Sequence, residues 1–324
     1  MEMRTRICDL LGIEYPVIQA GMSLFTSAEL VCAVSNAGGL GSLGCWRRTA
    51  EDFSREIAKI RDGTSRPFAI NHVVQALDED VFRMSLEARP ALISMALADP
   101  GELVKRIHDA GAKAMMQVTT VAQARQAAAR GIDIIVAQGS DGGGYIGSIG
   151  TMALVPQVLD AVRPLPVVAA GGIADGRGLA AALALGAEGV NVGTRFLASE
   201  EAPIGPAWKR GIVGAEAEDA VRVDVLNDIM PNPGRLGYGT VLRSLRSPFI
   251  DTWRERREEA AREAQRLLAE LVALTRAGRI GEAFPAAGQS AGMIRDIRPA
   301  GEIVRRLVEE ADKIITSLTP NCAR

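Results

Sequence analysis

Short apolar segments alternate along the chain with longer segments in which apolar residues recur every three or four positions. The short segments are bounded by glycine, proline or polar residues and predict buried strands, whereas the longer periodic ones predict helices. The predicted strands are 17–20, 40–42, 68–71, 92–95, 114–118, 132–137, 167–170 and 189–192. The predicted helices are 27–37, 50–61, 78–88, 100–110, 121–130, 152–162 and 176–185, with a last one near 302–316.

Eight strands, each followed by a helix, favour an α/β fold of the (β/α)8 TIM-barrel type over an open sheet. The rhythm breaks between residues 200 and 298, which hold a Pro/Gly-rich stretch at 230–239 and a long charged helix over 252–278 that ends at Gly278. We therefore expect a barrel made of residues 1–199 and 299–324, and an inserted helical lid subdomain, 200–298, between strand 8 and helix 8.

Composition and charge indicate which kinds of partner and which cellular location to expect. The net charge of −2 provides no basic surface for nucleic acid, and 4% aromatic residues provide few stacking platforms. We find no apolar run long enough for a signal peptide or a membrane span, so we expect a cytoplasmic protein with no membrane partner. The four cysteines and two histidines show no metal-ligand spacing, and no metal is expected.

The candidate site lies where the predicted strands end. Gly171 and Gly172 follow the seventh strand, and Gly193 and Thr194 follow the eighth. Glycine turns at the ends of neighbouring parallel strands expose main-chain N–H groups that suit a phosphate dianion, and this position in a TIM barrel commonly holds one.

The other strand ends carry glycine and neutral amides rather than charges. This set suits a planar, polar heteroaromatic ring with a phosphate tail, because amides match ring donors and acceptors while glycine permits close approach. The residues are Gly21 and Met22 after the first strand, Asn71 and His72 after the third, Gln117 after the fifth, and the loop 138–147 after the sixth.

Five motifs in order, IQAGMS, VAQGSDGGGYIG, VVAAGGI, GVNVGTRF and GQSAGMIRDIRPA, resemble the nitronate monooxygenase (2-nitropropane dioxygenase-like) family, which is related to the flavin-dependent enoyl-ACP reductases. The resemblance covers nearly the whole chain and implies an FMN-binding barrel with a small helical domain over the flavin. By position it implies FMN contacts from Ala20, Gly21, Met22, Asn71, Gln117, Gln138, Gly143, Gly144, Gly171, Gly172, Gly193, Thr194, Gln289, Ser290 and Gly292.

One position departs from the family pattern. Where the family has a histidine after its glycine pair, this sequence has Tyr145 after Gly143 and Gly144. A phenol with a pKa near 10 is a poor base at pH 7 but donates a hydrogen bond or a proton readily. Tyr145 is therefore one candidate catalytic residue. His72, at the end of the third strand, is the other, with a hydrogen bond to the loop backbone as the alternative role.

The resemblance implies an FMN-dependent oxidoreductase, and two activities follow. The first is oxidation of a nitronate or similar carbanion with O2. The alternative, favoured by Tyr145, is an NAD(P)H-linked reductase or dehydrogenase for an enone, a quinone or an acyl-CoA or acyl-ACP substrate. No GxGxxG fingerprint follows a strand, so NAD(P)H is expected to bind only transiently.

Two other classes stay open, a barrel isomerase or lyase for a sugar phosphate and a flavin-binding protein without activity. The expected partners are a small-molecule or acyl-thioester substrate, and a homodimer is left open.

Overall fold

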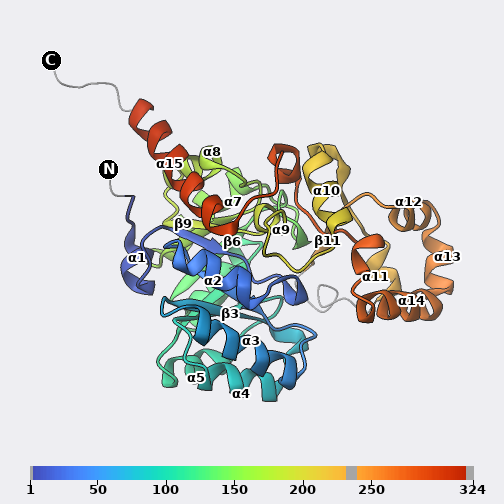
Figure 1. Cartoon of the computed structure of the whole chain (residues 1–324), viewed down its shortest axis with the longest axis horizontal. Coiled ribbons are helices and arrows are strands. Elements are labelled where there is room, and N and C mark those ends of the chain that lie inside the picture. Colours follow the sequence, from blue (N-terminus) through green and yellow to red (C-terminus); the bar gives the residue numbers. More distant parts are fainter. Residues whose placement is uncertain (1–2, 231–238, 319–324) are drawn as a thin grey trace.

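The computed structural model describes residues 3–230 and 239–318. Its centre is a barrel of eight parallel strands with helices around it, as predicted (Figure 1). The hydrogen-bonded order is β1-β9-β8-β6-β5-β4-β3-β2, and a bridge between Ile18 and Leu40 closes β1 against β2. The strands are β1 (Val17–Gln19), β2 (Gly41–Gly44), β3 (Phe68–Val73), β4 (Leu92–Ala96), β5 (Lys113–Val118), β6 (Ile134–Gln138), β8 (Val167–Ala170) and β9 (Gly189–Val192).

Helices follow the strands and form the outer layer. They begin where the sequence supplies an N-cap: Ser27, Thr49, Asp78 and Thr120 each accept a hydrogen bond from the main-chain N–H three residues later. The helices of this layer are α2 (Ala28–Asn36), α3 (Ala50–Gly63), α4 (Glu79–Glu87), α5 (Leu103–Asp109), α6 (Val121–Ala129), α7 (Thr151–Val162), α8 (Gly176–Ala184) and α15 (Ala300–Leu318). The barrel prediction is confirmed, with strand limits shifted by at most a few residues.

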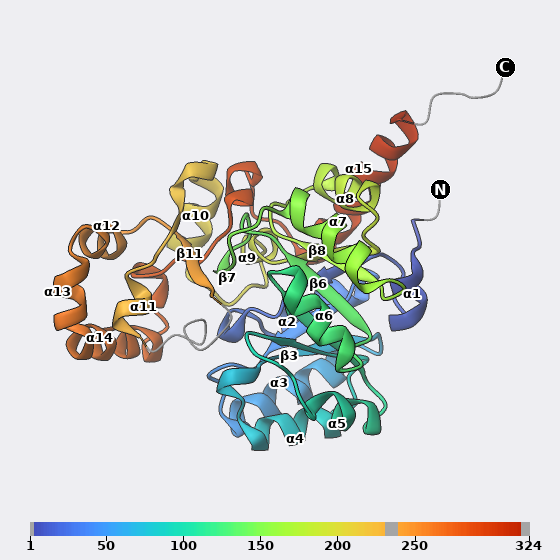
Figure 2. The same ribbon diagram turned by 180° about the vertical axis from the view of Figure 1, so that it is seen from behind.

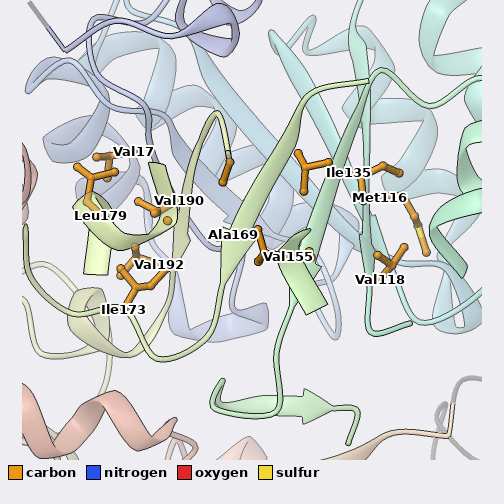
Figure 3. Packing of buried hydrophobic residues seen from close by; sticks show 14 of the residues in the cluster. Val17, Met116, Val118, Ile135, Val155, Ala169, Ile173, Leu179, Val190 and Val192 are labelled. Atoms are coloured by element: carbon orange, nitrogen blue, oxygen red, sulfur yellow. The ribbon is translucent and has the colours of Figure 1, made fainter. Parts of the chain in front are cut away.

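Most apolar side chains of the strands fall into two clusters, because alternate residues point to opposite faces of the sheet. One cluster fills the barrel interior and includes Ile18, Leu92, Val136 and Val168. The other packs strands against helices, and Figure 3 shows its members from the strands beside Val155 of α7 and Leu179 of α8. Whether a side chain at a strand end points into the barrel or outward therefore follows from its parity, that is, from whether an even or an odd number of residues separates it from an inward-facing residue of the same strand.

A short helix that the sequence analysis did not predict, α1 (Arg6–Leu11), precedes the barrel. Its Ile7, Cys8 and Leu11 are buried in the same cluster as the interior strand residues. It closes the end of the barrel where the strands begin, so the open end is the one where the strands finish.

The insertion lies to one side of the barrel, away from the start of α1 and the end of α15 (Figures 1 and 2). It follows the short helix α9 (Thr194–Leu197). Its elements are α10 (Pro206–Gly214), β10 (Ala220–Arg222), α11 (Leu226–Ile229), β11 (Val241–Leu245), α12 (Pro248–Glu255), α13 (Arg257–Arg262) and α14 (Ala264–Arg276). An insertion between strand 8 and helix 8 is confirmed, while its limits at residues 200 and 298 stay a prediction.

Two features of the insertion differ from expectation. The single helix expected over 252–278 is wrong: non-helical residues at Arg256 and Glu263 divide it into α12, α13 and α14. Trp253, Ala260 and Leu267, one from each of these helices, are buried in the same apolar cluster. Of the stretch 230–239, residues 231–238 lie outside the described residues.

The second feature is a three-stranded antiparallel sheet, β10-β11-β7, that the sequence analysis missed. Its edge strand β7 (Gly144–Ile146) belongs to the loop after β6, so the sheet joins the barrel to the insertion. Tyr145 lies opposite Leu242 in this pairing. Within residues 3–230 and 239–318, no helix is both long and apolar enough to span a membrane.

Candidate active site

A cavity of about 220 Å³ opens at the carboxyl ends of the barrel strands. Its walls come from the loops after these strands and from the returning segment 286–290 of the insertion. Among the described residues that line it, none carries a charge. Any ionic group that binds here must therefore be stabilised by dipoles rather than by an opposite charge.

The last inward-facing residue of several strands forms a polar ring in this cavity. Gln117 Nε2 donates to Gln138 Oε1 (2.8 Å), Gln138 Nε2 donates to the carbonyl of Gly143 (3.3 Å), and Asn71 Nδ2 donates to Ser94 Oγ (3.1 Å). These bonds orient the amides and leave acceptor oxygens for a ligand.

Three acceptor oxygens of this ring have no partner within the part of the chain that the structure describes. They are Asn71 Oδ1, Gln117 Oε1 and the buried Oδ1 of Asn191. A buried acceptor without a partner is costly, so a ligand with N–H or O–H donors at its edge would be favoured.

Two glycine turns form the opposite part of the cavity. Gly171 and Gly172, after β8, have φ values of +98° and +72°, which only glycine adopts at low cost. A Cβ at Gly171 would come within 3.0 Å of the main chain of Gly139 and Gly142. This turn therefore requires glycine, because its φ angles and its close packing leave no room for a side chain.

The amides of these turns are free. The N–H groups of Gly171, Gly172 and Gly193 donate no hydrogen bond to the described residues. Adjacent free N–H groups at two neighbouring strand ends make a concave donor surface of the kind that binds a phosphate. The predicted phosphate residues therefore do lie together.

The segment returning from the insertion closes over the second turn. Thr194 Oγ1 accepts a hydrogen bond from the Gly288 amide (2.9 Å), and Ser290 lines the cavity. Gln289 and Gly292, predicted with Ser290, are not among the residues that line it, and a cofactor contact from these two stays a prediction. Gly292 instead packs against Ala217, whose amide would lie 2.7 Å from an added Cβ.

The loop after β1 forms a further wall. Ala20, Gly21 and Met22 all line the cavity. Gly21 lies so close to Asn71 that any side chain at this position would overlap it. The wall is consequently flat, which suits a ring lying against it.

Tyr145 faces the cavity from β7. Gly143 lets the loop approach Ala287 and Gly288, since an added Cβ would lie 2.6 Å from their main chain. The phenol hydroxyl of Tyr145 makes no hydrogen bond to the described residues, and its ring makes an edge contact with Trp46 at 6.2 Å between centroids. Burial raises the pKa of Tyr145 above its ordinary value, an effect that the positive charge of Arg47 reduces. The phenol is thus a neutral hydrogen-bond donor at pH 7.

His72 does not reach the cavity, so the expectation that it points into the mouth is wrong. Asn71 shares its parity with the interior residue Ala69, whereas His72 shares the outward parity of Ile70. The imidazole is 2% exposed, lies 3.0 Å from Ser85 Oγ, and makes an edge contact with Phe82 of α4. Burial lowers its pKa to about 4, so it is neutral and structural in its surroundings.

Several lining residues were missed by sequence reasoning. Asn191 had a detectable signal, because it is a polar residue inside the apolar strand GVNV. Leu242 had none, since it reaches the cavity through the unpredicted sheet. The missed residues are Phe25, Trp46, Val73, Ala96, Leu97, Ala170, Ile173, Asn191, Val192, Leu197, Leu242, Ala286 and Ala287.

A second cavity, of about 180 Å³, adjoins the first. Six residues line both cavities, namely Ser23, Phe25, Trp46, Tyr145, Leu242 and Ala286. The rest of its wall comes mostly from apolar residues of the insertion. The two cavities therefore meet beside Tyr145.

Comparisons with known proteins agree with this geometry. The chain matches the sequence model of a family described as nitronate monooxygenase over residues 4–83 and 78–310. It is 34% identical over 343 residues to a (3aS,4S,5R,7aS)-5-hydroxy-7a-methyl-1-oxo-octahydro-1H-indene-4-carboxyl-CoA dehydrogenase of Mycobacterium tuberculosis, covering 96% of this chain and 97% of that protein. A probable nitronate monooxygenase of Staphylococcus saprophyticus is 34% identical over 283 residues, covering 72% and 79%.

Solved structures show the same architecture. FabK from Thermotoga maritima superposes with a TM-score of 0.87 at 34% identity, over 97% of this chain and 98% of that one. A nitroalkane oxidase from Streptomyces ansochromogenes gives 0.81 at 28% identity, over 97% and 99%. Together with the matched family and its relatives, these structures show that the chain belongs to the nitronate monooxygenase family of oxidoreductases.

Proposed function

We propose that the enzyme binds FMN in the first cavity and transfers a hydride to or from a carbon conjugated with a carbonyl group, as in an enone or an acyl thioester. The fit of FMN is supported by the free amides of Gly171, Gly172 and Gly193, which suit its phosphate. The unpartnered oxygens of Asn71, Gln117 and Asn191 suit the donors of its ring edge and ribityl chain.

When bound, FMN would supply the hydride chemistry, and the protein would supply position and hydrogen bonds. Tyr145 is placed to donate a hydrogen bond to the substrate carbonyl oxygen, where negative charge develops as a hydride is added to the β-carbon. A proton from solvent then reaches the α-carbon, so the substrate gains two electrons and two hydrogens in total. NADH or NADPH, bound transiently, would provide the two electrons.

The observation that carries this proposal is the half-buried, neutral phenol of Tyr145, unbonded to the described residues and located where the two cavities meet. The cavity offers this donor and, in the part of the chain described, no carboxylate, lysine or histidine that would serve as a base. Proton abstraction from a neutral carbon acid is therefore poorly supported, whereas polarising a carbonyl is well supported.

Oxidation of a nitronate with O2 is the second candidate. A nitronate arrives already deprotonated, so its oxidation needs no protein base, and the uncharged cavity does not oppose it. The similarity to a nitroalkane oxidase over 97% of this chain favours this candidate. A sugar-phosphate isomerase or lyase is disfavoured, because the described lining lacks the acid–base pair that such chemistry uses.

Three measurements test the proposal. Purified protein, reconstituted with FMN if necessary, should show the absorption spectrum of a bound flavin. Under anaerobic conditions, NADH or NADPH should then reduce it, and an enone or enoyl thioester should reoxidise it. Reduction by a nitronate but not by either nicotinamide would favour the second candidate, and failure to retain any flavin would reject both.

Tyr145→Phe is the sharpest variant for this site. It removes the hydroxyl and keeps the ring, so FMN binding should be unchanged while turnover of a carbonyl substrate falls about 100-fold, as for loss of one oxyanion donor. The matched control is Tyr15→Phe, which lies outside both cavities and should keep the full rate. An unchanged rate in Tyr145→Phe would remove this residue from the mechanism.

A further inference from the structure

The second cavity has one polar end. Its walls include Trp208, Leu226, Leu271, Ile280 and Phe284, all from the insertion and its return to the barrel. At the rim stands Arg47, from the loop after β2, and it is the one charged residue among the described residues lining either cavity. An apolar chamber with a single cation at its rim is the arrangement that an amphiphilic anion would complement.

Two contacts hold the Arg47 side chain in place. They maintain it although its main chain adopts a left-handed conformation with φ +67°, which is unfavourable for a residue with a side chain. Its guanidinium lies 4.7 Å from the centroid of the Trp46 ring, and Nη1 donates to Thr275 Oγ1 of α14 at 3.2 Å. The side chain therefore bridges the barrel loop and the insertion across the rim of the cavity.

No carboxylate neutralises this cation. Arg47 makes no ion pair within the described residues. By contrast, Arg279, which follows the lining residue Gly278, pairs with Glu282 at 2.7 Å. The charge of Arg47 also acts on the first cavity, because it lowers the pKa of Tyr145 against the effect of burial.

We propose that the second cavity receives the apolar body of the substrate and that Arg47 binds an anionic group on it. The enzyme would thus select amphiphilic anions, whose anionic group is either a carboxylate or a phosphate of an acyl-thioester carrier. This inference rests on the proposed function for the position of the reacting carbon beside Tyr145. The binding of the apolar body and the anion is independent of it.

The test is a calorimetric titration of the holoprotein at pH 7.5 with straight-chain carboxylates from butanoate to decanoate, with octanol, and with octanoyl-CoA. The apolar chamber predicts that affinity rises about fourfold for each added CH2 until the chain fills it. Arg47 predicts that octanoate, octanoyl-CoA or both bind about fivefold more tightly than neutral octanol, and less so in high salt.

Variants of Arg47 test whether this residue causes the preference for the anion over octanol. Arg47→Met should abolish the preference for the anion while leaving octanol affinity unchanged, and Arg47→Lys should restore most of it. Arg279→Met is the matched control and should keep the preference, because its charge is already paired. Preference for octanoate identifies a carboxylate as the anion, and preference for octanoyl-CoA alone identifies the carrier phosphates.

Three results would overturn the inference: affinity independent of chain length, equal binding of octanol and both anions, or an anion preference that survives in Arg47→Met. Failure of the proposed function looks different. In that case no flavin is retained or reduced, yet the same titrations of the protein as purified still report on the second cavity.

Discussion

Asn71 and His72 are neighbours in β3, yet they have opposite environments. Asn71 faces the barrel cavity, and His72 is buried among the residues of α4. The alternation of a strand decides this difference, and it was readable from Ala69 and Ile70 once the interior face was known. Residue type alone did not decide it, because both side chains are polar and both follow an apolar run.

The burial of His72 predicts a stability change with pH. Its pKa is about 4 in the folded protein against 6.5 in an unfolded chain. Between these values the unfolded chain binds a proton that the folded chain does not, so the stabilisation is complete above pH 6.5 and is lost as the pH falls toward 4. The loss should approach roughly 3 kcal/mol in the free energy of unfolding.

Urea unfolding at pH 7.5 and pH 5 should show about 2 kcal/mol of this loss. His72→Gln should reduce the change in the free energy of unfolding between these two pH values. His108→Gln, at an exposed position of α5, should retain this change. An equal pH dependence in the His72 variant and the parent protein would contradict this assignment.

At the scale of elements, the strands and their glycine turns were predictable and the insertion was less so. The apolar run VVAA occurs where β8 forms, because a strand covered on both faces is apolar throughout, and β9 follows this pattern except at Asn191, which lines the cavity. The sheet β10-β11-β7 was not predictable, since Tyr145 and Leu242 pair across nearly a hundred residues of sequence. The division of the long helix was likewise not predictable, since the breaks fall at Arg256 and Glu263, which favour helix by residue type.

Close packing of α8 against α15 gives a prediction at this scale. A Cβ at Gly176 would lie 2.3 Å from Glu310 Cβ and 2.4 Å from the Ala311 amide, so Gly176→Ala must push the two helices apart. We expect a loss of about 2 kcal/mol in the free energy of unfolding.

Gly214→Ala, in α10, is the matched substitution because open space surrounds that position. It should be neutral or stabilise by up to about 1 kcal/mol. Denaturant unfolding should therefore show a lower free energy of unfolding for Gly176→Ala than for the parent protein, and an equal or higher one for Gly214→Ala. Equal stabilities would show that α15 does not pack on α8 as described.

At the scale of the whole molecule, the barrel supplies the polar ring and the phosphate turns, while the insertion supplies the apolar chamber. Strand order placed the lining residues that directly follow the strands, such as Gly21, Asn71 and Gly171, whereas Trp46 and Leu97, also from barrel loops, were missed. The partners from the insertion, such as Leu242 and Ala287, come from chain paths that sequence patterns do not specify. The glycines and amides at the strand ends were therefore predictable, whereas most lining residues elsewhere in the barrel loops and in the insertion were not.

Ligand binding should stabilise the folded protein as a whole. If the first cavity binds FMN, then FMN at a hundredfold excess over its Kd should raise the free energy of unfolding by about 3 kcal/mol. Gly193→Ala should reduce the affinity for FMN at least tenfold, about 1.4 kcal/mol, because its methyl group would enter the phosphate turn. That methyl group would be only 3.4 Å from Met22 Sδ, an ordinary contact, so the protein without FMN should keep its stability.

Gly150→Ala, where nothing lies within 4 Å, is the control and should bind FMN normally. Thermal unfolding with and without FMN, together with fluorescence titration of the flavin, measures both effects. An unchanged FMN affinity in Gly193→Ala would place the phosphate elsewhere.

The start of α1 and the end of α15 both lie on the side of the barrel away from the insertion (Figure 1). A tag, a fused carrier or a covalent link to an electrode at either end would therefore leave both cavities open to solution. The same arrangement makes the protein suitable for oriented immobilisation, with every molecule presenting its substrate entrance outward.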